Sequence, residues 1–320
     1  MWRQIDTGYG KTRLPTVDAH AAFAIRSWTS SDGLRLAFRD YSGDTARLPV
    51  ICLPGLTRNA RDFEDLAGHI AASGRRVLCP DLRGRGESDY ARDPMTYQPP
   101  VYAQDLAGLL AAEAITRFVA VGTSLGGILT MMLAAGQPGL VAGAVLNDIG
   151  PVIEADGLAR VVDYVGQGRS YLTWMHAARG LRETMAEIYP DFTIEDWLRL
   201  AKRLMALGTG GRIAFDYDMK IAVPIEAAEE AKEAKEAAQG EGTSAAIAPD
   251  LWPAFDALAH VPIVVLHGAL SDILSAQTAA QMAARHPDCD LVTLPRVGHA
   301  PTLDEAECRA AIDRLLARLD

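Results

Sequence analysis

The stretch VAVGTSLGG, residues 119–127, places one serine among small residues directly after an apolar run. Gly122, Gly126 and Gly127 surround Ser124, although glycine is a poor former of helices and strands. A sharp turn from a strand into a helix explains this composition, because it forces the residues around the turn against each other and only small ones fit. The stretch therefore predicts a strained turn that exposes the Ser124 hydroxyl above a sheet.

The rest of the chain supplies the sheet that such a turn requires. Short apolar runs that end in glycine, proline or aspartate predict strands at residues 50–55, 75–81, 117–124, 142–150, 262–268 and 290–295. Segments of helix length lie between most of them, at residues 59–73, 101–115, 124–136, 275–286 and 304–319. Alternating runs about a Ser-Asp-Gly turn predict a hairpin at residues 23–41. This alternation predicts an α/β fold with a doubly wound, mostly parallel sheet covered by helices on both faces.

One interval breaks the alternation of strands and helices. Between Gly150 and Ala259 the sequence has helical periodicity and no comparable strand. We therefore predict a core domain made of residues 21–150 and 260–320, with residues 151–259 inserted as a helical cap.

Two segments of the predicted cap have distinct patterns. Thr193 and Asp196 resemble a capping box ahead of an amphipathic helix at residues 194–207. Residues 226–242 are rich in Ala, Glu and Lys, which predicts a solvated helix that frays after Gly240 rather than a binding site.

Composition excludes several classes of protein. With 49% hydrophobic and 22% charged residues the chain is an ordinary globular protein, and its net charge of -10 argues against nucleic acid or anionic lipid as a partner. The start of the sequence lacks the apolar core of a signal peptide, so we expect a cytoplasmic protein. The cysteines are scattered without a CxxC pair, which predicts free thiols, no metal site and no disulfide framework.

A serine hydroxyl becomes a nucleophile when a base removes its proton, and the base needs an acid to orient it. His299 follows the predicted strand at residues 290–295 and is expected to be the base. Asp272 follows the strand at residues 262–268 and gives the chain order Ser, Asp, His. Asp148 closes the strand after the serine turn and is the alternative acid.

In these features the chain resembles the α/β-hydrolase fold family, in the cap-bearing group that includes esterases, lactonases and carbon–carbon hydrolases. The resemblance spans residues 23–319 and rests on the motifs LPGLTRNARDF, DLRGRGES, GTSLGG, GALSD and VGHAP. It favours Asp272 as the acid, since its loop matches the more usual position in the family, whereas some relatives take their acid where Asp148 lies. DLRGRGES resembles the family's structural turn after a strand and lacks the pattern of a phosphate loop.

Two backbone N–H groups are expected to stabilise the oxyanion of an acyl-transfer reaction. The N–H of Leu125 begins the helix after the serine. The resemblance implies that the N–H of Leu56 is the second donor, although Pro54-Gly55 stands where the family commonly has His-Gly. Arg58 is expected to be solvated at the surface.

The predicted function is hydrolysis of small, fairly apolar carboxylic esters through an acyl-enzyme on Ser124, with no cofactor, by a monomer or homodimer. Carbon–carbon bond or lactone hydrolysis, and a cofactor-free perhydrolase or haloperoxidase, use the same three residue types. A ligand receptor with slow turnover is an alternative from another class. Epoxide hydrolases and dehalogenases need a carboxylate where Ser124 stands.

Overall fold

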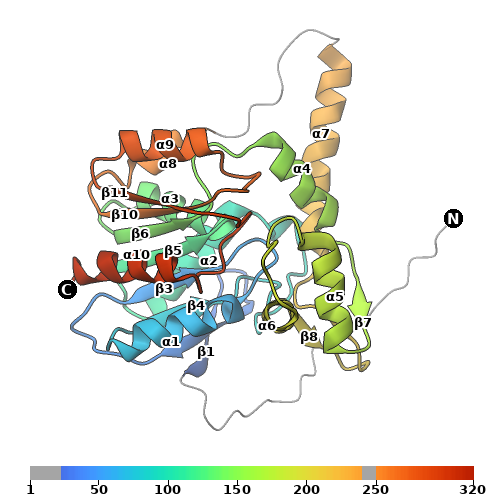
Figure 1. Ribbon diagram of the computed structural model, residues 1–320, viewed down its shortest axis with the longest axis horizontal. Helices are drawn as coiled ribbons and strands as arrows, with labels where there is room; N and C mark the ends of the chain where they lie inside the picture. Colours follow the sequence, from blue (N-terminus) through green and yellow to red (C-terminus); the bar gives the residue numbers. More distant parts are fainter. Residues whose placement is uncertain (1–22, 240–249) are drawn as a thin grey trace, which may run out of the picture.

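An eight-stranded sheet forms the centre of the protein (Figure 1). In spatial order its strands are β1 (Ala24–Thr29), β2 (Arg35–Tyr41), β4 (Val77–Pro80), β3 (Val50–Leu53), β5 (Phe118–Thr123), β6 (Val141–Asn147), β10 (Ile263–Gly268) and β11 (Cys289–Leu294). β1 and β2 pair antiparallel, which confirms the predicted hairpin, and β2 pairs antiparallel with β4. The remaining neighbours are parallel, so the predicted mostly parallel sheet is confirmed.

The computed structural model describes residues 23–239 and 250–320. Two predictions concern residues outside these ranges. They are the absence of a signal peptide at the start of the sequence and the fraying after Gly240.

Helices cover both faces of the sheet. One face packs against α1 (Glu64–Ala72) and α10 (Ala306–Ala317), and the other against α2 (Pro99–Ala112), α3 (Leu125–Gly136), α8 (Trp252–Asp256) and α9 (Ala276–Arg285). Successive side chains of a strand point to opposite faces, so Val119 and Val121 of β5 join the first layer while Phe118 and Ala120 join the second. Both layers are apolar, which explains why the sequence of β5 is a continuous apolar run.

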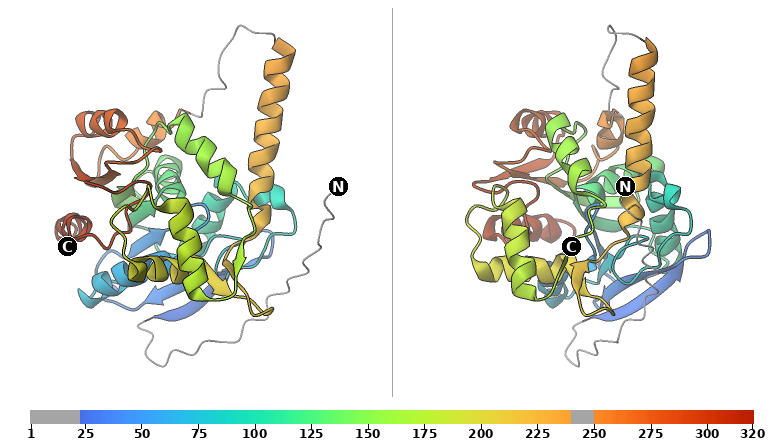
Figure 2. Two further views of the ribbon diagram at one scale, coloured as in Figure 1. Left: turned by 45° about the vertical axis from the view of Figure 1, so that its right-hand side comes forward. Right: turned by 90° about the vertical axis from the view of Figure 1, so that its right-hand side faces the viewer.

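Between β6 and α8 the chain forms a group of helices and short strands beside the sheet (Figures 1 and 2). In order they are α4 (Ala155–Tyr164), β7 (Ser170–Tyr171), α5 (Trp174–Met185), α6 (Ile194–Leu204), β8 (Met205–Leu207), β9 (Ile213–Phe215) and α7 (Val223–Gln239). The sequence predicts no strand here comparable to those of the core, and the short strands β7, β9 and β8 form a small antiparallel sheet. These strands have two or three residues each, too few to produce a recognisable alternation.

The insertion has an apolar core of its own between α5 and α6. Trp197 is buried there, and its ring meets the stacked rings of Tyr189 and Phe192 edge-on. The predicted capping box is confirmed: the Thr193 side chain accepts from the backbone of Asp196, whose carboxylate accepts from the backbone of Thr193. The helix therefore begins where the sequence predicts.

Contacts of α6 fix the insertion against the sheet domain. The buried side chain of Asn59, in the loop after β3, donates to the carbonyl of Arg203 at 3.1 Å. The Arg203 guanidinium pairs with Asp304 at 2.7 Å and with Asp65. Polar contacts thus connect α6 to two loops at one edge of the sheet.

The predicted turn at Ser124 is confirmed between β5 and α3. Ser124 has a φ of 53°, a conformation that is strained for any residue with a side chain. A Cβ atom added to Gly122 would lie 2.4 Å from the carbonyl oxygen of Gly126, and one added to Gly126 would lie 2.0 Å from that of Leu53. The glycines are therefore required by the close approach of β3, β5 and α3.

This packing predicts opposite effects for two glycine substitutions in α3. Gly126→Ala is expected to lower the free energy of unfolding by about 3 kcal/mol or more, because backbone has to move to admit the methyl group. Gly136→Ala is the control, since its added Cβ would have no atom within 4 Å. Gly136→Ala is expected to raise the free energy of unfolding by about 0.5 kcal/mol. Urea unfolding measures both, and equal effects would contradict the steric account.

Candidate active site

His299 lies between Ser124 and Asp148, within hydrogen-bond distance of both. Its Nε2 is 2.9 Å from Ser124 Oγ, and its Nδ1 is 2.8 Å from Asp148 Oδ2. The three residues follow β5, β6 and β11, whose carboxyl ends meet at one edge of the sheet. The imidazole side chain is only 9% exposed, so water competes little for these contacts.

The end of β6 holds the Asp148 carboxylate in a fixed position. The Asp148 N–H donates to the Leu266 carbonyl of β10 at 2.8 Å. Its Oδ1 accepts the Gly268 N–H at 2.8 Å, and its Oδ2 accepts the Ser271 hydroxyl at 2.6 Å as well as facing His299. Asp148 is completely buried, and these donors replace the water that its charge would otherwise require.

The expected pairing of His299 with Asp272 is wrong in this structure. Both oxygens of the Asp272 carboxylate contact the guanidinium of Arg160, which lies on α4. This guanidinium holds the pKa of the Asp272 carboxyl below its usual range, and the carboxylate is 38% exposed. The loop after β10 instead directs the hydroxyl of Ser271 toward the site, where it meets Asp148.

The two expected oxyanion donors lie on segments that touch the serine. Leu125 is the first residue of α3, and a Cβ added to Gly55 would lie 3.6 Å from Ser124 Cβ, so the loop of Leu56 passes close to Ser124. Within the described residues the N–H groups of Leu56 and Leu125 have no hydrogen-bond acceptor. Their role as oxyanion donors stays a prediction.

Arg85 positions the loop that carries Leu56, and sequence reasoning missed it. The Leu56 carbonyl accepts from Arg85 Nε at 2.9 Å and from Nη2 at 2.8 Å. The guanidinium is buried, and its Nη1 donates to the Arg83 carbonyl and to the Tyr102 hydroxyl. Arg85 belongs to the glycine-rich turn DLRGRGES, where its spacing gives no sign of a contact with the loop after β3.

Two further residues missed by the sequence hold the loop of His299. The buried Asn147 side chain donates to the Pro301 carbonyl at 2.9 Å and to Thr123 Oγ1 at 3.0 Å. From the insertion, the Tyr189 hydroxyl donates to the Ala300 carbonyl at 2.7 Å. Both contacts are side chain to backbone and distant in sequence, so periodicity gives no signal for them.

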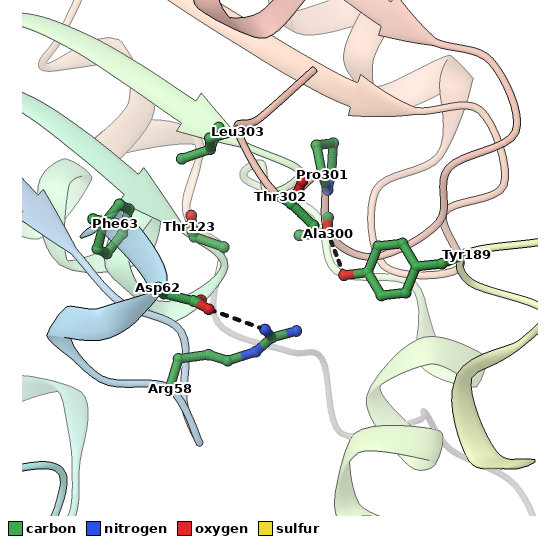
Figure 3. Close-up of a pocket in the computed structure, with 9 residues that line it drawn as sticks. All are labelled: Arg58, Asp62, Phe63, Thr123, Tyr189, Ala300, Pro301, Thr302 and Leu303. Atoms are coloured by element: carbon green, nitrogen blue, oxygen red, sulfur yellow. Dashed lines mark hydrogen bonds and ion pairs between the residues drawn. The ribbon is translucent and has the colours of Figure 1, made fainter. Parts of the chain in front are cut away.

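A pocket lies beside the triad, and its lining includes the residues adjacent to Ser124 and His299 (Figure 3). The enclosed part of this pocket is small, about 10 Å³, which is room for about one water molecule, and its total empty space of about 280 Å³ includes open solvent. The lining residues are Arg58, Asp62, Phe63, Thr123, Tyr189, Ala300, Pro301, Thr302 and Leu303. The expectation that Arg58 is solvated at the surface is wrong, since its side chain is 16% exposed and lines this pocket.

The part of the chain that the structure describes has neither a candidate metal site nor a candidate membrane span. Within it, no group of three His, Cys, Asp or Glu side chains is arranged to hold a metal ion. Among residues 23–239 and 250–320, no helix combines the length and apolar character needed to cross a membrane.

Comparison with known proteins identifies the family of this chain. The sequence model of the alpha/beta hydrolase family matches residues 50–311, and the chain belongs to this family. It is 33% identical over 281 residues to a 3-hydroxybutyrate-oligomer hydrolase from Cupriavidus necator, which covers 87% of this chain and 91% of that protein. It is 28% identical over 246 residues to a 2-(acetamidomethylene)succinate hydrolase from Mesorhizobium japonicum, covering 77% and 79% of the two chains.

A solved structure has the same fold over almost its whole length. The crystal structure of an alpha/beta hydrolase from Novosphingobium aromaticivorans matches with a TM-score of 0.84 and 61% sequence identity, covering 93% of this chain and 99% of that one. The fold and the membership of a hydrolase family thus agree with the resemblance seen in the sequence motifs.

The contacts of Arg85 predict a loss of stability when its guanidinium is removed. Arg85→Met leaves the Leu56 carbonyl without its buried donors, and we expect the free energy of unfolding to fall by about 3 kcal/mol. Arg314→Met is the matched control, because Arg314 is largely exposed and is expected to change stability by less than about 0.5 kcal/mol. Urea unfolding measures both, and a similar change in the two variants would contradict the assigned role.

Proposed function

We propose that this protein is a serine hydrolase that cleaves small carboxylic esters through an acyl-enzyme on Ser124, with His299 as the base and Asp148 as its orienting acid. The observation that carries the proposal is the continuous series of hydrogen-bond distances from Ser124 Oγ through the imidazole to Asp148. No cofactor is needed for this reaction, since the three side chains supply the nucleophile and the proton transfer.

The reaction begins when His299 Nε2 accepts the proton of Ser124 as its oxygen attacks the ester carbonyl. The Asp148 carboxylate holds the proton on Nδ1, which leaves Nε2 free to act as the base, and stabilises the imidazolium. The N–H groups of Leu56 and Leu125 stabilise the oxyanion. His299 then protonates the leaving alcohol and later activates the water that releases the acid.

The proposal assigns residues 151–259 as a cap over the core formed by residues 21–150 and 260–320. Support comes from the contacts that the insertion makes with the loops of the site, including Tyr189 with Ala300 and Arg160 with Asp272. A cap in this position limits the substrate to a small molecule and excludes bulk water from the reaction.

One of the two relatives described above favours ester hydrolysis. An oligomer of a hydroxy acid is joined by ester bonds, and the relative from Cupriavidus necator is a hydrolase of 3-hydroxybutyrate oligomers. The match covers 91% of that protein, so it includes nearly the whole of a hydrolase that acts on such bonds. Ester hydrolysis is also the chemistry that the triad geometry supports.

Replacing the proposed nucleophile is expected to stop turnover. Ser124→Ala should lower kcat for p-nitrophenyl butyrate by ~10⁴-fold or more, since no other group takes over the attack. Phenylmethylsulfonyl fluoride should modify the wild-type protein at Ser124, as located by peptide mass spectrometry. Unchanged esterase activity in the variant would remove the proposed mechanism.

Two aspartate variants distinguish the acid found here from the one that the sequence favoured. Asp148→Asn should lower kcat by about 10³- to 10⁴-fold, because an amide stabilises the wrong tautomer of His299. Asp272→Asn should lower kcat by less than about fivefold, because it loses a partly exposed ion pair with Arg160. Steady-state kinetics on one ester compares them, and the reverse order of effects would restore Asp272 as the acid.

A further inference from the structure

Arg58 lies next to the proposed nucleophile. Both side chains pack against Gly55. A Cβ atom added to this glycine would lie 3.3 Å from Arg58 Cγ and 3.6 Å from Ser124 Cβ. The Arg58 N–H donates to the Gly55 carbonyl at 3.1 Å, which closes a tight turn and directs the side chain along the pocket of Figure 3. A cation therefore stands within the reach of a small molecule bound at Ser124.

The guanidinium of Arg58 is only partly used by the protein. Among the described residues its one ion pair is a single contact of 3.2 Å from Nη1 to Asp62 Oδ1. A guanidinium carries five N–H donors, and a carboxylate typically takes two of them side by side. The Tyr189 hydroxyl is a further hydrogen-bond partner of the guanidinium. Asp62 and Tyr189 together fix the orientation of the group and use only part of its donors.

Other arginines of this protein pair with two carboxylates at once. Arg76 contacts Asp40 and Glu113, and Arg83 contacts Asp32 and Asp105. Arg58 is similarly withdrawn from water, yet it has one such partner. The comparison indicates that the Arg58 guanidinium has fewer carboxylate partners than Arg76 and Arg83, so a ligand could supply a second one.

The neighbouring arginine at the site does not offer the same opportunity. Arg160 uses Nε and Nη2 to contact both oxygens of Asp272, which occupies the side of the guanidinium suited to a carboxylate. Arg58 is therefore the cation near the triad with donors left for a substrate.

We propose that Arg58 binds a free carboxylate of the substrate, so that the preferred esters at Ser124 carry an acid group on the part that lies beside Arg58. This inference rests on the proposed function and narrows its substrate class from small esters to esters with a carboxylate. Asp62 and Tyr189 line the same pocket as the guanidinium. The Tyr189 hydroxyl is itself fixed by its hydrogen bond to the Ala300 carbonyl.

Matched ester pairs test the preference for a charge. Mono-p-nitrophenyl esters of succinic, glutaric and adipic acid place the carboxylate on the acyl side, and p-nitrophenyl esters of the corresponding methyl-capped acids are neutral controls. For at least one chain length, wild-type kcat/KM should be about 10- to 100-fold higher for the acid than for its neutral control, as charge-assisted hydrogen bonds imply. Arg58→Met should remove this preference, with most of the change in KM.

Control variants separate substrate binding from a structural role of Arg58. Arg58→Lys keeps a charge and should retain part of the preference, while Arg199→Lys on α6 is the matched control at an exposed position and should retain all of it. If Arg58 only supports its loop, Arg58→Met lowers kcat/KM equally for both members of a pair. That result would overturn the proposal.

Binding without turnover keeps this test independent of the ester chemistry. In the Ser124→Ala background, calorimetry should show monomethyl glutarate, or a homologue one carbon shorter or longer, binding at least about tenfold more tightly than its dimethyl ester. Acetyl esters of 3-hydroxypropionic acid, against their methyl-capped forms, test a carboxylate on the alcohol side. Equal affinities throughout would overturn the role of Arg58, whereas unchanged hydrolysis by Ser124→Ala would overturn the proposed function instead.

Discussion

The close approach of β3, β5 and α3 at the serine turn is the constraint on which the site depends. A Cβ on Gly126 would collide with the carbonyl of Leu53, so the loop after β3 and the start of α3 meet with no side chain between them. This contact brings the Leu56 loop and the N-terminus of α3 together beside Ser124. The same geometry places Arg58 beside Ser124, since Arg58 lies on the loop after β3 that packs closely against the serine turn.

The neighbouring positions of β6 and β10 explain why two aspartates compete for one role. Asn147 of β6 pairs in register with Leu266 of β10, so a residue just past either strand can reach the imidazole. The choice between them depends on local contacts: donors from Gly268 and Ser271 hold Asp148 inside, while Arg160 draws Asp272 outward. In the sequence, Asp148 and Asp272 both lie between the serine and the histidine and both follow a strand, so neither feature distinguishes them. The residue that separates them in the structure is Arg160, which lies on α4.

The features that the sequence predicts are those with a local cause. Periodicity located the strands, glycine spacing located the turn of Ser124, and the Thr193–Asp196 pattern located the start of α6. The contacts of Arg85 with Leu56, and of Tyr189 with Ala300, join residues far apart in sequence through a side chain and a carbonyl. A carbonyl acceptor is present at every residue, so nothing in the residue type of the partner marks such a contact in advance.

The insertion contacts both the loop of His299 and the loop of Leu56, which carry groups of the proposed site. The Gly298 N–H donates to the Ile188 carbonyl at 2.8 Å, next to the histidine, while Asn59 joins the loop of Arg58 to the end of α6. A rigid displacement of this part of the insertion would therefore disturb the positions of His299 and of the Leu56 loop together. Under the proposed function, these contacts hold the side chains of the site in their relative positions before a substrate binds.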